Sequence, residues 1–398
     1  MPLNVLIAGG GPAAIEAALT LHRVAGEHVE TTLLAPDAEF TYRPLSVLEP
    51  FAAGVAPGYA LSRIAADAGF AHRHGSLARV DAAAHTVETV TGEEIGYDVL
   101  LVATGAVAIR PVNGGVAFTG SAADEEALHG LIQDVEGGYT RRVALVVPKG
   151  NGWPLPLYEL ALMLAARAFE MGVVVDLHLI TPEDAPLGLF GPRAAREVEA
   201  LLQTAGIALH AGTEAERLDH DRLRLMPGEE QLDVSRVVTL ARLEGPAIVG
   251  LPPNPEGFLA TDEHGRVEGV PDVYAAGDVT AFGVKQGGIA CQQADAAAEH
   301  IAARAGAAVD PKPFSPVLRG MLLTEHWARF LRHKGPDTVG DDSAVAGRAL
   351  WWPPNKIAGR ELASYLHGLD EELSRVRGLP VQTEIDADTR AVEVLSLH

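Results

Sequence analysis

The stretch that decides the fold reads VLIAGGGPAA and covers residues 5–14. A short apolar run of β-forming residues ends in three glycines, and an alanine-rich segment with helical spacing follows. Because a second β-rich run lies at residues 31–34, the start of the chain predicts a strand–helix–strand unit. Within that unit, Gly9, Gly11 and Ala14 have the spacing of the dinucleotide-binding fingerprint.

This glycine turn is suited to a pyrophosphate. Gly9 permits the tight turn, and Gly11 lets the backbone come close to the phosphates. The helix that opens with Pro12 and Ala13 then offers free backbone N–H groups to the anion. A tight turn without a ligand is the alternative, but the order strand, turn, helix, strand favours the binding interpretation.

One expected group is missing from the unit. A carboxylate that binds the ribose should end the second strand, but the residue there is Ala35. Asp37 lies two positions later and is the candidate for this role. The alternative is that Pro36 and Asp37 only begin a turn.

The strand–helix–strand plan recurs in residues 143–180 and suggests a second nucleotide-binding domain. Strands and helices alternate along the chain, which predicts parallel sheets. Further strands are expected at residues 99–103, 143–147, 173–180 and 237–240, and a helix at 155–170.

The pattern predicts an α/β fold: two Rossmann-like dinucleotide-binding domains, each with three layers (ββα/βαβ), and a small C-terminal α+β unit. The expected division gives residues 1–110 and 241–310 to the first domain, 111–240 to the second and 311–398 to the last unit. In that unit we expect an exposed loop at 336–347, a largely polar helix at 361–377 and a β-hairpin at 381–397.

Composition excludes several classes of function. The net charge of −22 over 398 residues disfavours nucleic acid and an anionic membrane surface as partners. The chain starts with β-strand residues rather than a signal peptide, and it contains no apolar run of membrane-spanning length. We therefore expect a cytoplasmic protein with a small-molecule substrate and without a transmembrane segment.

The chain contains a single cysteine, Cys291. It therefore has no intramolecular disulfide, no paired redox thiols and no cysteine zinc site, and no metal site is predicted. Cys291 lies in a stretch rich in Ala and Gly, where a small buried side chain is favoured over a nucleophile.

Two later motifs complete a pattern. Residues 97–105 read YDVLLVATG and residues 273–278 read VYAAGD, each a short strand that ends in small residues. Together with the first glycine turn they resemble the FAD-binding signature of the pyridine nucleotide-disulfide oxidoreductase superfamily, over roughly residues 3–305. The resemblance implies FAD as cofactor, with the pyrophosphate at the first turn and the ribitol near Asp278. It implies these FAD residues: Gly9, Gly11, Pro12, Ala13, Ala35, Asp37, Arg43, Pro44, Ala103, Thr104, Gly105, Gly277, Asp278, Lys285 and Gly287.

Two stretches narrow the resemblance to the branch of sulfide:quinone oxidoreductase and type II NADH dehydrogenase. FTYRPL at residues 40–45 is similar to a loop beside the flavin, and KQGGIACQQA at residues 285–294 is similar to a helix whose N-terminus faces it. This implies that Lys285 and the helix end stabilise the reduced, anionic flavin. Gln292 and Gln293 match part of a pattern beside a quinone site, so a quinone is a candidate acceptor; plain helix-surface amides are the alternative.

The second glycine turn departs from the NADH-binding pattern. Residues 147–159 read VPKGNGWPLPLYE, in which Leu155 takes the third small position and the acid, Glu159, comes late. Bulky residues there would crowd a pyrophosphate, so NAD(P)H is a candidate ligand only, with Glu183 or Asp184 as candidate ribose acids. The PLYE element resembles sulfide:quinone oxidoreductases, which have a cysteine where this chain has Trp153.

These observations leave two functions open. The leading hypothesis is a FAD-dependent oxidoreductase that moves electrons from a small-molecule donor, with NAD(P)H one candidate, to an acceptor such as a quinone. Sulfide oxidation is excluded because persulfide transfer needs paired thiols. Trp153 either walls the substrate face of the flavin or packs in the core. The alternative function is a non-catalytic or donor-divergent flavoprotein with a degenerate NAD(P) domain.

Three roles are open for Trp351 and Trp352: they pack in the core, they cap an acceptor pocket, or they form a homodimer interface.

Overall fold

The computed structural model describes residues 1–110, 115–150, 152–217, 219, 221–324, 327–334 and 343–376. The first domain is built on a five-stranded parallel sheet. The strands in spatial order are β20 (Val273–Ala275), β9 (Val99–Val102), β1 (Leu3–Ala8), β2 (Val29–Ala35) and β5 (Ala71–His74).

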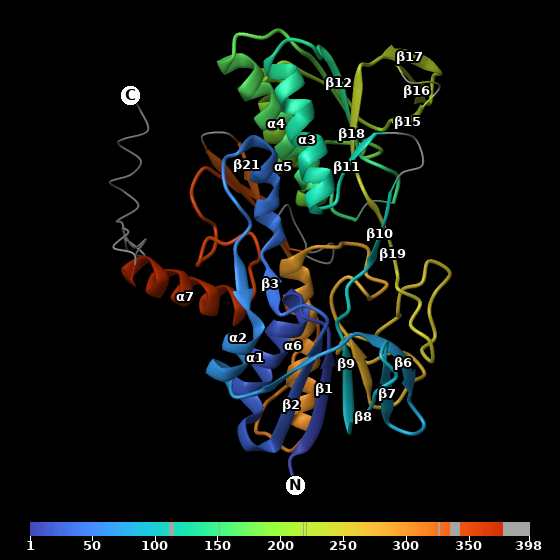
Figure 1. Cartoon of the computed structure of the whole chain (residues 1–398), viewed down its shortest axis with the longest axis vertical. Helices are drawn as coiled ribbons and strands as arrows, with labels where there is room; N and C mark the ends of the chain where they lie inside the picture. The colour runs from blue at the N-terminus through green and yellow to red at the C-terminus, as the bar shows by residue number, and fades with distance from the viewer. Residues whose placement is uncertain are drawn as a thin grey trace.

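Helices cover one face of this sheet and a small antiparallel sheet covers the other (Figure 1). The helices are α1 (Pro12–Ala25), α2 (Leu61–Ala68) and α6 (Gly287–Arg304), and the small sheet holds β6 (Leu77–Asp81), β7 (Thr86–Thr89) and β8 (Glu94–Gly96). With both faces covered, β9 is buried throughout, which explains why its sequence is continuously apolar instead of alternating. The three expected layers are therefore present.

The second domain repeats this plan. Its parallel sheet has the spatial order β11 (Val116–Phe118), β18 (Arg236–Leu240), β12 (Arg142–Val146), β13 (Asp176–Ile180) and β14 (Ile207–His210). The helices are α3 (Ala122–Glu136), α4 (Leu155–Glu170) and α5 (Pro192–Thr204), and the antiparallel layer holds β15 (Glu214–Arg217), β16 (Arg222–Met226) and β17 (Glu230–Asp233). An antiparallel ribbon of β10 (Val107–Ile109) and β19 (Arg242–Glu244) joins the two domains.

The C-terminal unit adds an antiparallel sheet of β21 (Val317–Leu323), β22 (Ala328–Lys334) and β23 (Ala344–Ala346), followed by α7 (Leu362–Val376). The expected loop at 336–347 is wrong in its described part, because β23 pairs with β22 and Ser343 is buried there. The expected hairpin at 381–397 lies outside the described residues. The remaining elements are β3 (Glu39–Thr41), β4 (Gly58–Ala60) and the 3-10 helices η1 (Gly26–His28), η2 (Arg43–Phe51) and η3 (Gly188–Phe190).

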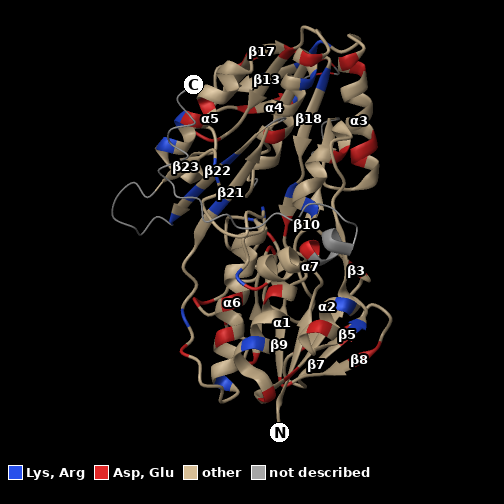
Figure 2. Ribbon diagram, turned by 90° about the vertical axis from the view of Figure 1, so that its left-hand side faces the viewer, with Lys and Arg blue, Asp and Glu red and all other residues tan. Residues whose placement is uncertain are grey.

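Charge is distributed unevenly over the molecule. Figure 2 shows acidic side chains on α3 and basic positions on β21 and β22 of the C-terminal sheet. Arg319 and Arg332 stand opposite each other in that sheet; burial, and then the charge of Arg332, lower the pKa of Arg319. No described helix combines the length and the apolar character needed to span a membrane.

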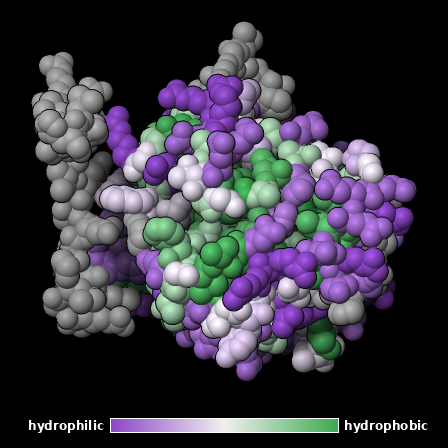
Figure 3. All heavy atoms as spheres, turned by 90° about the horizontal axis from the view of Figure 1, so that it is seen from above, coloured by the Kyte–Doolittle hydropathy of each residue, from purple (hydrophilic) through white to green (hydrophobic). Residues whose placement is uncertain are grey.

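One end of the second domain exposes apolar side chains. Tyr139, Phe169, Met171 and Val174 lie in or next to the loops that precede β12 and β13, and each is more than half exposed. Figure 3 looks onto this end and shows apolar areas between hydrophilic ones. Because these loops precede the strands, the patch lies at the edge opposite to the carboxyl ends, where ligands of such sheets bind.

Candidate functional site

Three sequence motifs meet at one edge of the first sheet. They follow β1, β9 and β20, which are neighbours in the sheet, and the register pairs Ala8 and Ala275 with Val102 at the last position of each strand. The chain ends of these parallel strands therefore lie side by side, at the carboxyl edge where a dinucleotide binds in such folds.

The first turn has the geometry of a phosphate cradle. Gly9 has φ +136°, and a Cβ there would lie 2.2 Å from the carbonyl oxygen of Ala103, so only glycine fits. Gly11 is the N-cap of α1, and a Cβ on it would meet nothing within 4 Å. Pro12 and Ala13 open the helix, so its first N–H groups face the open side of the turn.

The second and third turns complete the same edge. Thr104 is exposed after the buried Ala103, and Gly105 has φ +76° with open space around it. Gly277, with φ +82°, packs so closely on α1 that a Cβ would lie 3.0 Å from the Cβ of Ala13. Its N–H donates to Oε1 of Gln293 at 2.8 Å.

Asp278 supplies a carboxylate to this edge. Burial raises its pKa, and the charge of Lys285 acts in the opposite direction. Among the described residues no side-chain or backbone donor binds the carboxylate. A partly buried acceptor without a donor, next to two open glycine turns, fits a ligand hydroxyl such as that of a ribityl chain.

Lys285 packs against the turn that carries Asp278. Its Nζ donates to the carbonyl oxygens of Asp278 and Thr280 and lies 3.8 Å from the ring centroid of Phe258. Burial lowers the pKa of Lys285 to about 8, against the attraction of Asp278. The ammonium thus braces the Gly277-Asp278 turn from within the protein, and its expected role toward a reduced flavin stays a prediction.

The expected ribose acid remains absent. Ala35 is fully buried below the first turn, where the Cβ of a residue at position 10 would lie 3.0 Å from it. Asp37 is exposed in the bend after β2. The role of Asp37 as a ribose ligand stays a prediction.

The FTYRPL loop is held by a segment that the sequence did not connect with it. Residues 356–362, here called the strap, run between β23 and α7 across both domains. The hydroxyl of Tyr42 accepts from the N–H of Ile357 at 2.7 Å, and the carbonyl of Pro44 accepts from Nζ of Lys356 at 3.0 Å. Arg43 between them is exposed.

Two buried glutamates hold the strap. Glu159 of α4 is fully buried and pairs with Nζ of Lys356 at 2.7 and 2.8 Å, while burial raises the pKa of Glu159. Glu16 of α1, also fully buried, accepts from the three backbone N–H groups of residues 360–362 at 2.6–2.9 Å. Burial, with the charge of Asp295, raises the pKa of Glu16 to about 8. Glu159 is therefore engaged by the strap and is not available to a nucleotide.

The helix that follows Lys285 is anchored by its polar residues. Gln292 exchanges hydrogen bonds with the backbone of Val317 (2.8 and 3.0 Å), and Gln293 holds Gly277. The glutamines are thus structural clamps rather than surface amides. Gly287 lies under the strap, since a Cβ there would be 2.9 Å from Cγ1 of Ile357.

Cys291 is completely buried, and burial raises the pKa of its thiol well above the ordinary value. Its Sγ lies 3.8 Å from the carbonyl oxygen of Pro12. It is the small buried residue that the sequence predicted, behind the first turn.

The two C-terminal tryptophans differ. Trp351 packs edge-on against Phe330 and donates to the carbonyl of Asn355 at 2.9 Å. Trp352 is 43% exposed and contacts His367 edge-on. These contacts fit packing for Trp351, and the other roles expected for the two tryptophans stay predictions.

The second glycine turn is closed where the first is open. A Cβ on Gly152 would lie 2.5 Å from the carbonyl oxygen of Gly283, so the turn packs on the segment before α6. Pro154 is the N-cap of α4 and Pro156 follows in its first turn, which removes two N–H groups that a phosphate would use. Trp153 packs edge-on against Phe190, with 5.8 Å between centroids.

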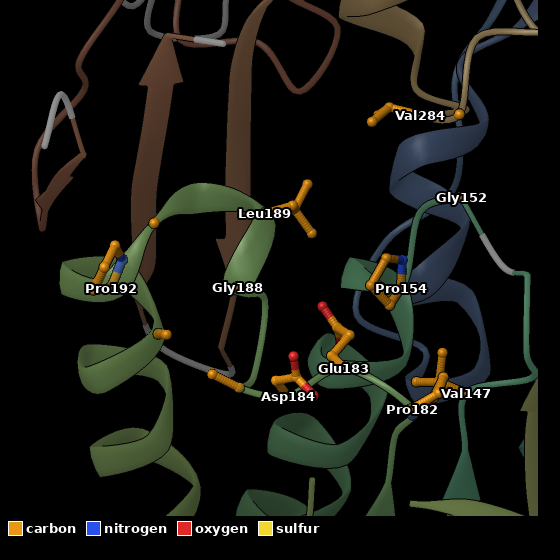
Figure 4. Close-up of a pocket in the computed structure, with 14 residues that line it drawn as sticks. Val147, Gly152, Pro154, Pro182, Glu183, Asp184, Gly188, Leu189, Pro192 and Val284 are labelled. Atoms are coloured by element: carbon orange, nitrogen blue, oxygen red, sulfur yellow. The ribbon is translucent and has the colours of Figure 1, made fainter. Parts of the chain in front are cut away.

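A cavity of about 620 Å³ lies beside this turn (Figure 4). It is lined by residues that follow β12 and β13, by the starts of α4 and α5, and by Gly283 and Val284 of the first domain. Glu183 lines it and accepts from the hydroxyls of Tyr158 at 2.7 Å and Thr181 at 2.9 Å; burial raises its pKa.

The residues at the first edge fit FAD. The open space above Gly11, the open turn at Gly105 and the carboxylate of Asp278 match a pyrophosphate, a flat ring system and a ribityl hydroxyl, respectively. The described residues contain no group of three His, Cys, Asp or Glu side chains arranged for a metal ion.

Comparison with known structures supports this architecture. The sulfide:quinone oxidoreductase of the hyperthermophilic bacterium Aquifex aeolicus superposes with a TM-score of 0.78 at 20% identity, over 100% of this chain and 96% of that one. A ferredoxin reductase of Rhodopseudomonas palustris superposes with a TM-score of 0.60 at 18% identity, over 83% and 81%. At these identities the likeness establishes the fold.

Comparison with curated sequences and family models identifies the family. NADH dehydrogenase-like proteins of two strains of Mycobacterium tuberculosis are each 29% identical over 234 residues, 56% of this chain. The match spans 58% of the length of these relatives. The family model described as pyridine nucleotide-disulphide oxidoreductase, whose members typically bind FAD and NAD(P), matches residues 3–299. The chain belongs to the pyridine nucleotide-disulphide oxidoreductase family.

Proposed function

We propose that this protein is a FAD-dependent oxidoreductase that passes electrons from a small-molecule donor to an acceptor such as a quinone. The convergence of three glycine-containing turns at the ends of β1, β9 and β20, two of them with open space at Gly11 and Gly105, supports FAD binding most directly. When bound, FAD would supply the redox chemistry, accepting two electrons and releasing them again. The curated relatives named as NADH dehydrogenase-like support a small-molecule donor.

The chain's own residues would bind and orient the cofactor. The N–H groups at the start of α1 would hold the pyrophosphate, and Asp278 would accept from the ribityl chain. Lys285 would keep the Gly277-Asp278 turn in place through its two carbonyl contacts. Trp153, packed on Phe190, would wall the substrate face of the flavin, the role that the sequence analysis weighs against core packing.

Sulfide oxidation through persulfide is not part of the proposal. That reaction needs a thiolate and a second, resolving thiol, and the chain has one cysteine, which is buried with a raised thiol pKa. Cys291→Ser should therefore leave flavin reduction and reoxidation unchanged.

The cofactor is tested by a matched pair of glycine variants. Gly11→Ala places a methyl group where the protein leaves space, so it should lower FAD affinity at least about tenfold while the apoprotein unfolds as before. Gly130→Ala in α3 also meets nothing within 4 Å and should leave FAD affinity unchanged, while it stabilises the apoprotein by roughly 0.5–1 kcal/mol because alanine replaces glycine inside a helix. FAD is released from the protein by heating and quantified by chromatography, and the stability of the apoprotein is measured by thermal unfolding. FAD retention by Gly11→Ala equal to that of Gly130→Ala would contradict the proposed cradle.

The redox function is tested on the FAD-loaded protein. Anaerobic mixing with NADH or NADPH, followed by a soluble quinone, should be monitored by flavin absorbance. If NADH or NADPH reduces the flavin, that nucleotide is a donor. If only other compounds reduce the flavin, the protein is an oxidoreductase whose donor is not a nicotinamide nucleotide. Retained FAD without turnover for any donor and quinone pair would instead support the non-catalytic flavoprotein.

A further inference from the structure

The cavity beside the second glycine turn is built for a ligand unlike a dinucleotide. It lies at the carboxyl edge of the second sheet, between the ends of β12 and β13, where a dinucleotide would place its pyrophosphate. We propose that this cavity binds a small organic cation with an apolar body, such as a protonated amine.

The charged residues of the lining favour a ligand with a positive charge. None of the described residues that line the cavity is Lys, Arg or His, whereas Glu183 and Asp184 are both part of the lining. In Figure 4 the Glu183 side chain extends from the strand end toward Pro154 and Leu189, and Asp184 lies beside it. A carboxylate pair in a cleft with few opposing charges attracts cations and repels phosphates.

The cations near the cavity are held by other groups or lie outside its lining. Lys285, whose Cγ would lie 2.9 Å from a Cβ on Gly152, directs its Nζ to the carbonyls of Asp278 and Thr280. Lys149 belongs to the glycine turn but is held by Glu214, with 2.8 Å between Nζ and Oε1. Arg193 follows Pro192 in the first turn of α5 and is exposed outside the lining.

The helix ends that border the cavity offer few backbone donors to a phosphate. Pro154 and Pro156 remove N–H groups from the start of α4, and the N–H of Leu157 is already donated to the carbonyl of Pro154 at 3.0 Å. At the start of α5, Pro192 lacks a further N–H group. Backbone recognition of an anion is therefore weakened at both helices.

The rest of the lining is apolar and fits the body of such a ligand. Its carbon surface comes from residues of both domains that contact one another through Gly152 and Gly283. These apolar side chains are Val147, Pro154, Pro182, Leu189, Pro192 and Val284. Because Gly283 and Val284 directly precede Lys285, the cavity adjoins the turn that carries Asp278. The cation bound there would be positioned to act as the electron donor, and that role rests on the proposed function. The binding of the cation is independent of the proposed function.

The test uses three probes of one size on the FAD-loaded full chain: naphthalen-1-ylmethylammonium, 1-naphthalenemethanol and 1-naphthoate. Isothermal titration calorimetry should give the cation an affinity at least about tenfold above that of the anion, with the alcohol between them. Equal affinities, tighter binding of the anion, or no saturable binding of any probe would overturn the proposal.

Variants assign the preference to the cavity. Glu183→Gln should reduce the cation preference most, and Asp184→Asn, at an exposed position, should reduce it about threefold without a folding defect. The control is Asp176→Asn at the opposite end of β13, which should change nothing. A cation preference that persists in both cavity variants would overturn the assignment. FAD content, measured on the same samples, reports separately on the proposed function.

Discussion

The two dinucleotide-type domains share one plan but use the start of the equivalent helix in opposite ways. In the first, Gly11 leaves open space before α1. In the second, Gly152 packs against Gly283, and Pro154 and Pro156 occupy the first turn of α4. A glycine turn after a strand is therefore only a scaffold, and its contacts decide whether an anion can bind there.

The two helices also agree in one respect. Each buries a single glutamate that holds the strap: Glu16 in α1 binds three backbone N–H groups, and Glu159 in α4 binds the ammonium of Lys356. One tie is thus made of neutral donors and the other is a buried ion pair, so their removal should have different costs.

The largest effect is expected at the ion pair. Lys356→Met leaves the carboxylate of Glu159 buried without its partner and should lower the free energy of unfolding by about 3–5 kcal/mol. Replacing both residues, Lys356→Met with Glu159→Leu, should restore much of that loss. Chemical denaturation of the wild type, the single variant and the double variant measures the free energies of unfolding. If Lys356→Met is as stable as the wild type, the ion pair does not hold the strap.

A smaller effect, visible mainly as pH dependence, is expected at Glu16. Its pKa is raised from 4.5 to about 8 in the folded state, so between these values the folded protein binds the extra proton. Stability should therefore fall as pH rises through this window and level off above it. In the wild type, Glu16 should lower the free energy of unfolding by about 1–3 kcal/mol between pH 5 and pH 8, and Glu16→Gln should abolish this part of the pH dependence. Identical slopes in the two proteins would refute the assignment to Glu16.

The smallest effect is expected from reopening the second helix. Pro154→Ala with Pro156→Ala returns two N–H groups to the start of α4, so the affinity for ADP, measured by calorimetry, should rise about threefold. Gly152 remains packed in this variant, which limits the gain. Pro313→Ala, at an exposed position far along the chain, serves as the control. An unchanged affinity would mean that the packed turn alone excludes the anion.

Much of the architecture could be predicted because it depends on local patterns. The apolar run before Gly9 and the helix at residues 155–170 are encoded in consecutive residues, and α4 has the predicted bounds. The motifs of the first site were also visible, because each requires small residues at a strand end.

The roles of long-range partners could not be predicted. Glu159 meets Lys356 197 positions later, and Glu16 meets residue 362 346 positions later, so no local spacing connects them. The contacts of Nζ of Lys285 with the carbonyls of Asp278 and Thr280 were likewise not visible in the sequence. Nor did the sequence show that Gln292 and Gln293 bind the backbone of Val317 and Gly277.

The strap has a consequence for how the molecule comes apart. Glu16 of α1 and Glu159 of α4 fasten the strap to one helix of each domain, and both side chains are buried. Neither domain can therefore separate from the strap without exposing one of these two glutamates. We expect calorimetry to give one cooperative transition for the two domains, and amide exchange at Ile357 and at residues 360–362 to be as slow as in the central strands.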